Sequence, residues 1–154
     1  MGGDTQIRCF GAPEAVPVLT KNLRISSAGE NDVVDLTLRV REAVRGTGLS
    51  TGIVIVFVSG STGAVTTMEY EPGLVQDFPR MLERVSPRSI AYEHQKAWND
   101  YNGHSHVKAS LVGPSLTVPF VDGELALGTW QQVVFIELDT RPRERNIVLQ
   151  VIGE

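Results

Sequence analysis

All three histidines of the chain lie within one short stretch, at His94, His104 and His106. Histidine is the side chain most often used for proton transfer or metal binding near neutral pH. His104 and His106 are two residues apart, so an extended segment would place both on one face, together with Lys108 and Ser110. The stretch therefore predicts a polar strand that lines a site, although an ordinary half-exposed strand has the same pattern.

The same histidines could serve two kinds of chemistry. His104 and His106 could bind one metal ion, with His94 or Asp100 as a third ligand, because three nitrogen or oxygen ligands and an open position describe a catalytic zinc site. Without a metal, one histidine could act as a base and another could hold an anion. We therefore expect either a divalent metal (zinc or magnesium) or a metal-free acid–base site.

A loop of small residues is the second candidate. Ser59–Gly63 follows an apolar run, and its backbone N–H groups and the hydroxyls of Ser61 and Thr62 could hold a phosphate group. The loop lacks the Gly-Lys-Ser/Thr ending of a P-loop. A plain turn fits the same residues, so both interpretations stay open.

Two further groups could take part. Glu69 is a candidate acid or base or an orienting partner for a histidine, whereas Glu71 is better placed to cap a helix that begins near Pro72. After Gly128, a bulge could re-aim Thr129 and Gln131 toward a ligand.

Composition limits the remaining possibilities. The chain has 154 residues, a net charge of −4 and one cysteine, which predicts one domain without an intrachain disulfide. No basic block is present, which disfavours a nucleic-acid partner. The most apolar run, 53–58, is too short to span a membrane, and the N-terminus does not resemble a secretory signal. We expect a cytoplasmic protein with no membrane partner.

The periodicity predicts an N-terminal arm over residues 1–18 and one α+β domain over 19–154. Mostly antiparallel or mixed sheets and two main helices are expected. The helices should run from Asp35 to Gly46 or Gly48 and from Pro72 to about Val85. Predicted strands cover 21–26, 53–58, 64–70, 107–112, 116–121, 125–127, 132–138 and 146–152. The 53–58 strand is expected to be buried on both faces.

Several motifs occur together in one order: Glu69-Tyr-Glu-Pro-Gly73, Tyr92-Glu-His94, Asp100-Tyr-Asn-Gly-His-Ser-His-Val-Lys-Ala-Ser-Leu-Val-Gly113, Gly128-Thr-Trp-Gln131 and Gln150-Val-Ile-Gly-Glu154. With them the sequence resembles the YjbQ family, small proteins associated with a secondary thiamine-phosphate synthase activity. The resemblance covers roughly residues 20 to 154.

The resemblance implies a compact α+β homotrimer with pockets between subunits. It also implies a small phosphorylated substrate: a pyrimidine diphosphate and a thiazole phosphate would be joined into thiamine phosphate, with release of pyrophosphate. The residues that it singles out are His94, Asp100, Asn102, His104, His106, Lys108, Thr129 and Gln131.

The sequence departs from the family pattern in one loop. Many members place a histidine after the central strand, where this chain reads Ser59-Gly-Ser-Thr-Gly-Ala64. If that histidine takes part in catalysis in the family, this chain has lost the activity or binds a different ligand. A metal-dependent hydrolase or metal-binding protein using His94, His104 and His106, and a non-catalytic trimer that binds a small anion, are the alternatives.

Overall fold

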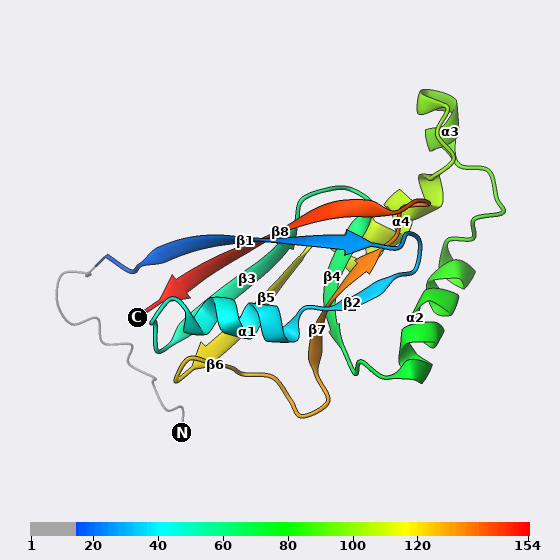
Figure 1. The fold of residues 1–154 in the computed structure, drawn as a ribbon. Helices are drawn as coiled ribbons and strands as arrows, with labels where there is room; N and C mark the ends of the chain where they lie inside the picture. Colours follow the sequence, from blue (N-terminus) through cyan, green and yellow to red (C-terminus); the bar gives the residue numbers. More distant parts are fainter. Residues whose placement is uncertain (1–14) are drawn as a thin grey trace, which may run out of the picture.

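A five-stranded antiparallel sheet forms the larger layer of the computed structural model, which describes residues 15–154 (Figure 1). Its strand order is β1-β8-β3-β5-β6. The strands are β1 (Val18–Ser27), β3 (Gly52–Val58), β5 (Ser115–Val121), β6 (Glu124–Leu125) and β8 (Arg143–Gly153). The predicted arm over 1–18 lies mostly outside the described residues.

A second, three-stranded sheet has the order β2-β7-β4, with β2 at Val33–Asp35, β4 at Gly63–Met68 and β7 at Gln132–Glu137. Every paired strand is antiparallel to its neighbour. The largest apolar cluster joins both sheets with α1 (Thr37–Arg45), which ends at Gly46. The predicted α+β class with antiparallel pairing is confirmed.

The central strand β3 is buried on one face only. Val54 and Val56 are fully buried in the core, whereas Ile53 is 36% exposed and Phe57 is 39% exposed. Burial on both faces was predicted from the unbroken apolar run, and within a single chain this prediction is wrong. Asp122 and Gly123 form the hairpin turn between β5 and β6, and both residues have positive φ, as a tight type I′ turn requires.

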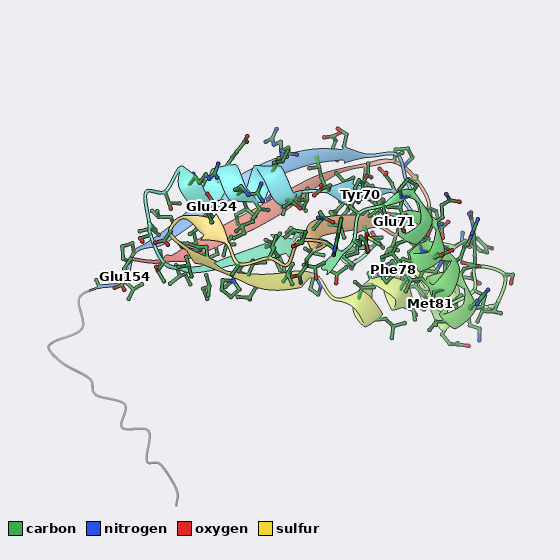
Figure 2. The ribbon with its side chains drawn as sticks, turned by 90° about the horizontal axis from the view of Figure 1, so that it is seen from below. Tyr70, Glu71, Phe78, Met81, Glu124 and Glu154 are labelled. Carbon is green, nitrogen blue, oxygen red and sulfur yellow. The ribbon has the colours of Figure 1, made fainter. Side chains whose placement is uncertain are left out.

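The helix predicted from Pro72 is confirmed as α2 (Pro72–Val85). The Glu71 carboxylate accepts hydrogen bonds from the backbone N–H groups of Gly73 and Leu74, which caps the first turn (Figure 2). Pro79 lies inside α2, and the helix continues through it.

The segment after Gly103 is the main correction. It forms the helix α4 (Gly103–Val112), not a strand, and a short unpredicted helix, α3 (Glu93–Trp98), precedes it. In Figure 1, α3 stands apart from both sheets, at the end of the molecule where α2 and α4 also lie. Between residues 15 and 154, no helix is long and apolar enough to cross a membrane.

Candidate functional site

The helix α4 presents two pairs of polar side chains to different surroundings. His104 and Lys108 are four residues apart, as are His106 and Ser110, so each pair shares a helix face. Two residues of an α-helix span about 200° of rotation, which turns His106 away from His104. The prediction that all four side chains share one face is therefore wrong.

The first pair, His104 and Lys108, is fully enclosed in an ion cluster. We define this cluster as Glu30, Glu83, Arg88, His104 and Lys108. His104 is 1% exposed and Lys108 is 0% exposed. The His104 Nε2 atom lies 3.0 Å from Oε1 of Glu30, and Lys108 Nζ lies 2.6 Å from Oε2 of Glu83. Lys108 Nζ also lies 3.4 Å from Oε1 of Glu30.

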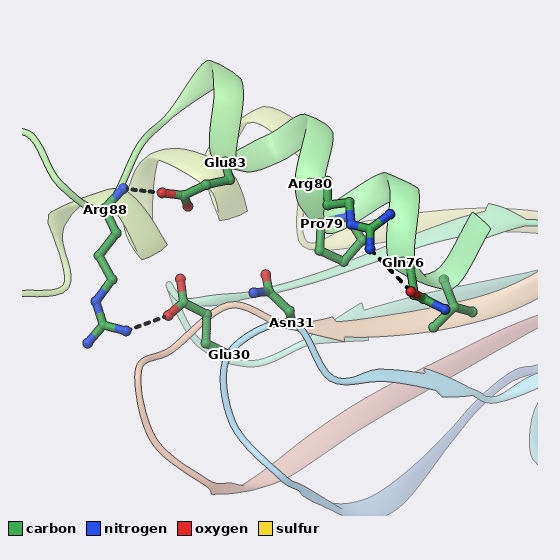
Figure 3. Close-up of a pocket in the computed structure, with 8 residues that line it drawn as sticks. Glu30, Asn31, Gln76, Pro79, Arg80, Glu83 and Arg88 are labelled. Atoms are coloured by element: carbon green, nitrogen blue, oxygen red, sulfur yellow. Dashed lines mark hydrogen bonds and ion pairs between the residues drawn. The ribbon is translucent and has the colours of Figure 1, made fainter. Parts of the chain in front are cut away.

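Arg88 joins this ion cluster from the chain that follows α2. Its guanidinium lies 3.2 Å from Oε2 of Glu30, and its backbone N–H donates to Oε1 of Glu83 at 2.7 Å (Figure 3). A cleft of about 560 Å³ opens beside these residues, with Gln76 and Arg80 further along it. The cluster therefore links α2, α4, the loop after α2 and the turn between β1 and β2.

Burial sets the protonation of the enclosed histidine. Desolvation lowers the pKa of His104, and the nearby Glu30 carboxylate opposes that effect only in part. The hydrogen bond from Lys108 lowers the pKa of Glu83. His104 is therefore held neutral in the folded chain at neutral pH, next to the ion pairs.

The second pair, His106 and Ser110, lines a pocket of about 130 Å³, which we call the loop pocket. Its walls are formed by the loop after β3 and by α4, and it is lined by Gly60, Ser61, Gly63, His106, Ala109, Ser110 and Pro114. The structure thus brings the predicted small-residue loop and one predicted histidine together. Lys108, which was expected to share a face with His106, points into the ion cluster instead.

The His106 ring is supported from several sides. Its centroid lies 4.5 Å from that of His94, with the two rings tilted by 46°. Desolvation lowers the pKa of His106, and His94 adds to this effect. Asp139 and Asp100 oppose it, as does the nearby backbone of Ser61. A neutral imidazole carries one unprotonated nitrogen, which can accept a proton.

Gly103 allows the His94 segment to pack against α4. A Cβ atom on Gly103 would lie 2.5 Å from Cβ of Tyr92 and 3.3 Å from Cβ of His94. The Tyr92 hydroxyl is itself held, since it donates to the Pro87 carbonyl at 2.8 Å. A residue without a side chain at 103 is therefore needed for the close approach of His94 to His106.

Buried charged residues hold the loop after β3 in place through Thr62. Thr62 is 5% exposed, and its hydroxyl accepts a hydrogen bond from Arg145 at 2.8 Å and donates to Asp139 at 3.3 Å. Arg145 is also paired with the fully buried Glu137. Burial acts to raise the pKa of Asp139, but the hydrogen bond from Arg143 and other favourable contacts outweigh burial and lower it. Thr62 is thus committed to the scaffold, whereas Ser61 is exposed at the pocket.

The remaining predicted residues lie elsewhere. Glu69 follows the far end of β4, and Gln131 donates from Nε2 to the Thr67 hydroxyl at 3.0 Å. Thr129 is exposed in the same region. A strand of this length spans roughly 20 Å, so within one chain this group is separated from the loop pocket.

Asp100 and Asn102 precede α4. Asp100 is exposed at the end of the α3 segment. Asn102 occupies the N-cap position of α4 and is 5% exposed, and its Oδ1 has no hydrogen-bond partner among the described residues.

Within residues 15–154, no group of three or more His, Cys, Asp or Glu side chains is arranged to hold a metal ion. The predicted three-histidine metal site gains no support from this arrangement.

Sequence reasoning missed the carboxylates that lie on the two sides of α4, near His104 and near the loop pocket. Glu30 lies in a turn and Glu83 on a helix surface, where charged residues are normally solvated. Glu137 and Asp139 end an apolar strand, and this was the one available signal, because a carboxylate there must be paired or exposed.

Comparison with known proteins gives a consistent family. The sequence profile of the UPF0047 protein YjbQ-like family matches residues 21–154. A UPF0047 protein of Methanothermobacter thermautotrophicus is 37% identical over 137 residues, which cover 89% of this chain and 94% of that protein. UPF0047 protein YugU of Bacillus subtilis is 30% identical over 137 residues, with 88% and 100% covered.

Solved structures agree. A crystal structure of a YbjQ-like protein of unknown function from Sulfolobus solfataricus P2 matches with a TM-score of 0.85 at 31% identity, covering 91% of this chain and 100% of that chain. A hypothetical protein from Aeropyrum pernix K1 matches with a TM-score of 0.81 at 31% identity, covering 88% and 99%. The chain therefore belongs to the UPF0047 (YjbQ-like) family.

Proposed function

We propose that the chain acts on a small phosphorylated molecule at the loop pocket, in a reaction of the thiamine-phosphate synthase type. The observation that supports this proposal is the position of His106, which faces a loop of small hydroxylated residues and is held neutral by burial. A neutral imidazole with one free nitrogen can accept a proton near pH 7. Ser61 supplies a hydroxyl group beside it, whereas the Ser110 hydroxyl donates to the His106 carbonyl at 2.8 Å and can offer a ligand only its oxygen as an acceptor.

The reaction would use these groups to handle the diphosphate. The thiazole nitrogen forms a bond to the methylene carbon of the pyrimidine diphosphate, while the bond from that carbon to the diphosphate oxygen breaks. Negative charge then builds on the departing pyrophosphate, and donors placed beside it lower the barrier. A bound diphosphate would also raise the pKa of His106, because a nearby anion favours the protonated ring. His106 would therefore take up a proton from solvent when the substrate binds. It would donate that proton to the pyrophosphate oxygen that keeps the electron pair of the broken bond, and so act as the acid.

The size of the loop pocket indicates which part of the substrate it would hold. At about 130 Å³ it is smaller than the 300 Å³ or more that is usual for a pocket enclosing a whole small molecule. It suits the phosphate end, and the rest of the ligand would extend beyond this chain. We propose that a second copy completes the site, with Thr129 and Gln131 as the contributed residues.

The proposed homotrimer has support in the outer face of the larger sheet. Ile53, Phe57 and Val18 are 36%, 39% and 58% exposed, although they lie on paired strands of that sheet. Apolar side chains gathered on one face are typical of a surface that another protein covers. A neighbouring copy would bury β3 on both faces, as its sequence predicts.

The test is product formation from the two thiamine precursors. Purified protein with the pyrimidine diphosphate and the thiazole phosphate should yield thiamine phosphate and pyrophosphate in equal amounts. His106→Gln should lower the rate by roughly 100-fold or more, as loss of an acid–base group does. Lys96→Ala, an exposed change on α3, is the control and should leave the rate unchanged.

Two results would overturn this proposal. Absence of product from the unaltered protein would remove the synthase reaction, and a full rate in His106→Gln would remove the role of the loop pocket. Thermal stabilisation by phosphate esters without any product would instead identify a non-catalytic anion-binding trimer, since a ligand that binds only the folded state raises stability. The metal-dependent alternative stays a prediction that elemental analysis of untagged protein would test.

A further inference from the structure

The helix α4 has little hydrophobic anchoring for an element that carries a site residue. Its larger apolar side chains face outward, with Val107 41% exposed and Leu111 59% exposed. Ala109 is its one fully buried apolar residue, and Val112 packs against the same core while partly exposed. Removing an alanine side chain from water contributes little compared with a leucine or valine. Packing of apolar groups therefore contributes only a small part of what holds α4 in place.

Polar groups occupy the buried face instead. His104, Ser105 and Lys108 are the side chains that α4 buries most completely. Lys108 contacts Glu83 of α2 and Glu30 of the turn after β1, at 2.6 Å and 3.4 Å. Charged hydrogen bonds of this kind are directional, so they fix both the rotation and the height of the helix.

We propose that the ion cluster sets the position of His106, so that Lys108 and Glu30 are positioning residues for the loop pocket on the opposite side of α4. The importance of this position rests on the proposed function. The structural part does not, because the contact between the His106 and His94 rings can be observed without any turnover. Small displacements of a reacting group matter, since a shift of about 1 Å can cost roughly 100-fold in rate.

The variants must separate helix position from folding. Lys108→Met removes both ion pairs at similar side-chain length. Because Glu30 would then keep a buried charge with fewer partners, Lys108→Met/Glu30→Gln is the second variant, and it leaves no new unpaired carboxylate at that position. Lys108→Arg keeps the charge and can donate to both carboxylates. Leu111→Ala is the matched control on the exposed side of the same helix.

The readout is the nuclear magnetic resonance signal of the imidazole C–H groups. The chain has only three histidines, so His→Gln variants assign each signal. We expect the His94 and His106 signals to change in folded Lys108→Met or Lys108→Met/Glu30→Gln, to return in Lys108→Arg and to stay unchanged in Leu111→Ala. The kcat for thiamine phosphate should fall roughly 100-fold in the double variant and recover in Lys108→Arg.

Unchanged His94 and His106 signals in the folded double variant would overturn the inference, even if His106→Gln abolishes turnover. Lack of turnover in the unaltered protein would reject the proposed function, and the resonance comparison would still decide whether the ion cluster positions His106. The two failures are therefore distinguishable.

Discussion

His104 and His106 are two residues apart in the chain and occupy different environments on α4. His104 is enclosed, with its Nε2 atom 3.0 Å from a Glu30 carboxylate oxygen. His106 packs against His94 beside an open pocket. This separation assigns a structural role to one histidine and leaves the other available to a ligand.

Replacing His104 should therefore affect stability more than replacing His94. His104→Ala leaves Glu30 without one of its buried partners and opens a cavity, so the free energy of unfolding should fall by about 1–3 kcal/mol. His94 is half-buried, and His94→Ala should cost less than about 1 kcal/mol. Urea unfolding of both variants checks this order, and equal losses would contradict it.

Stability should also depend on pH through the histidines. The pKa values of His104 and His106 are lowered in the folded chain, so the unfolded chain binds more protons as the pH falls through the ordinary histidine range. The free energy of unfolding should then rise with pH between about 5.5 and 7.5. Urea titrations across this range measure the slope, which should be smaller in His106→Gln. A slope that is unchanged in the variant would be inconsistent with burial of His106.

The glycine at the start of α4 offers a test of the His94 contact. In Gly103→Ala the new Cβ would meet Cβ of Tyr92 at 2.5 Å, so the 92–94 segment must move or the helix must shift. We expect a loss of about 1–3 kcal/mol of stability. In the control Gly128→Ala the new Cβ has its nearest neighbours at 3.8 Å and 3.9 Å, and this change should be nearly neutral. Thermal unfolding compares the two, and a stable Gly103→Ala would show that the segment yields freely.

Assembly can be tested on the exposed sheet face. Phe57→Lys places a charge on the apolar outer face of β3, while the inner face is left intact. If copies meet there, the variant should be a folded monomer under conditions in which the unaltered chain is a trimer, because burying an unpaired charge is costly. Lys96→Ala is the control. Sedimentation equilibrium gives the masses, and a trimeric Phe57→Lys protein would exclude this face.

Most of the fold follows from local patterns. The alternation in β1, the cap at Glu71, the Asp122-Gly123 turn and the end of α1 at Gly46 are all determined within a few residues of the chain. Local steric and hydrogen-bonding preferences are enough to set such features.

The site was less predictable because α4 buries polar side chains and exposes its larger apolar ones, the opposite of most helices in water-soluble folds. From His106 to Leu111, polar residues at even positions and apolar residues at odd ones give the two-residue period of a strand. In the folded chain Lys108 and His104 are paired with distant carboxylates, and the larger apolar side chains of Val107 and Leu111 remain exposed. Such partners depend on tertiary contacts, which no local pattern contains.

The most direct test is the rate of thiamine phosphate formation in two isosteric variants compared under conditions in which both are folded. If the account holds, His106→Gln loses roughly 100-fold or more of the rate per folded molecule, because it removes the acid–base group at the loop pocket. His104→Gln loses stability and retains the larger part of its rate. A full rate in His106→Gln, together with a lost rate in folded His104→Gln, would contradict the assignment of the functional face.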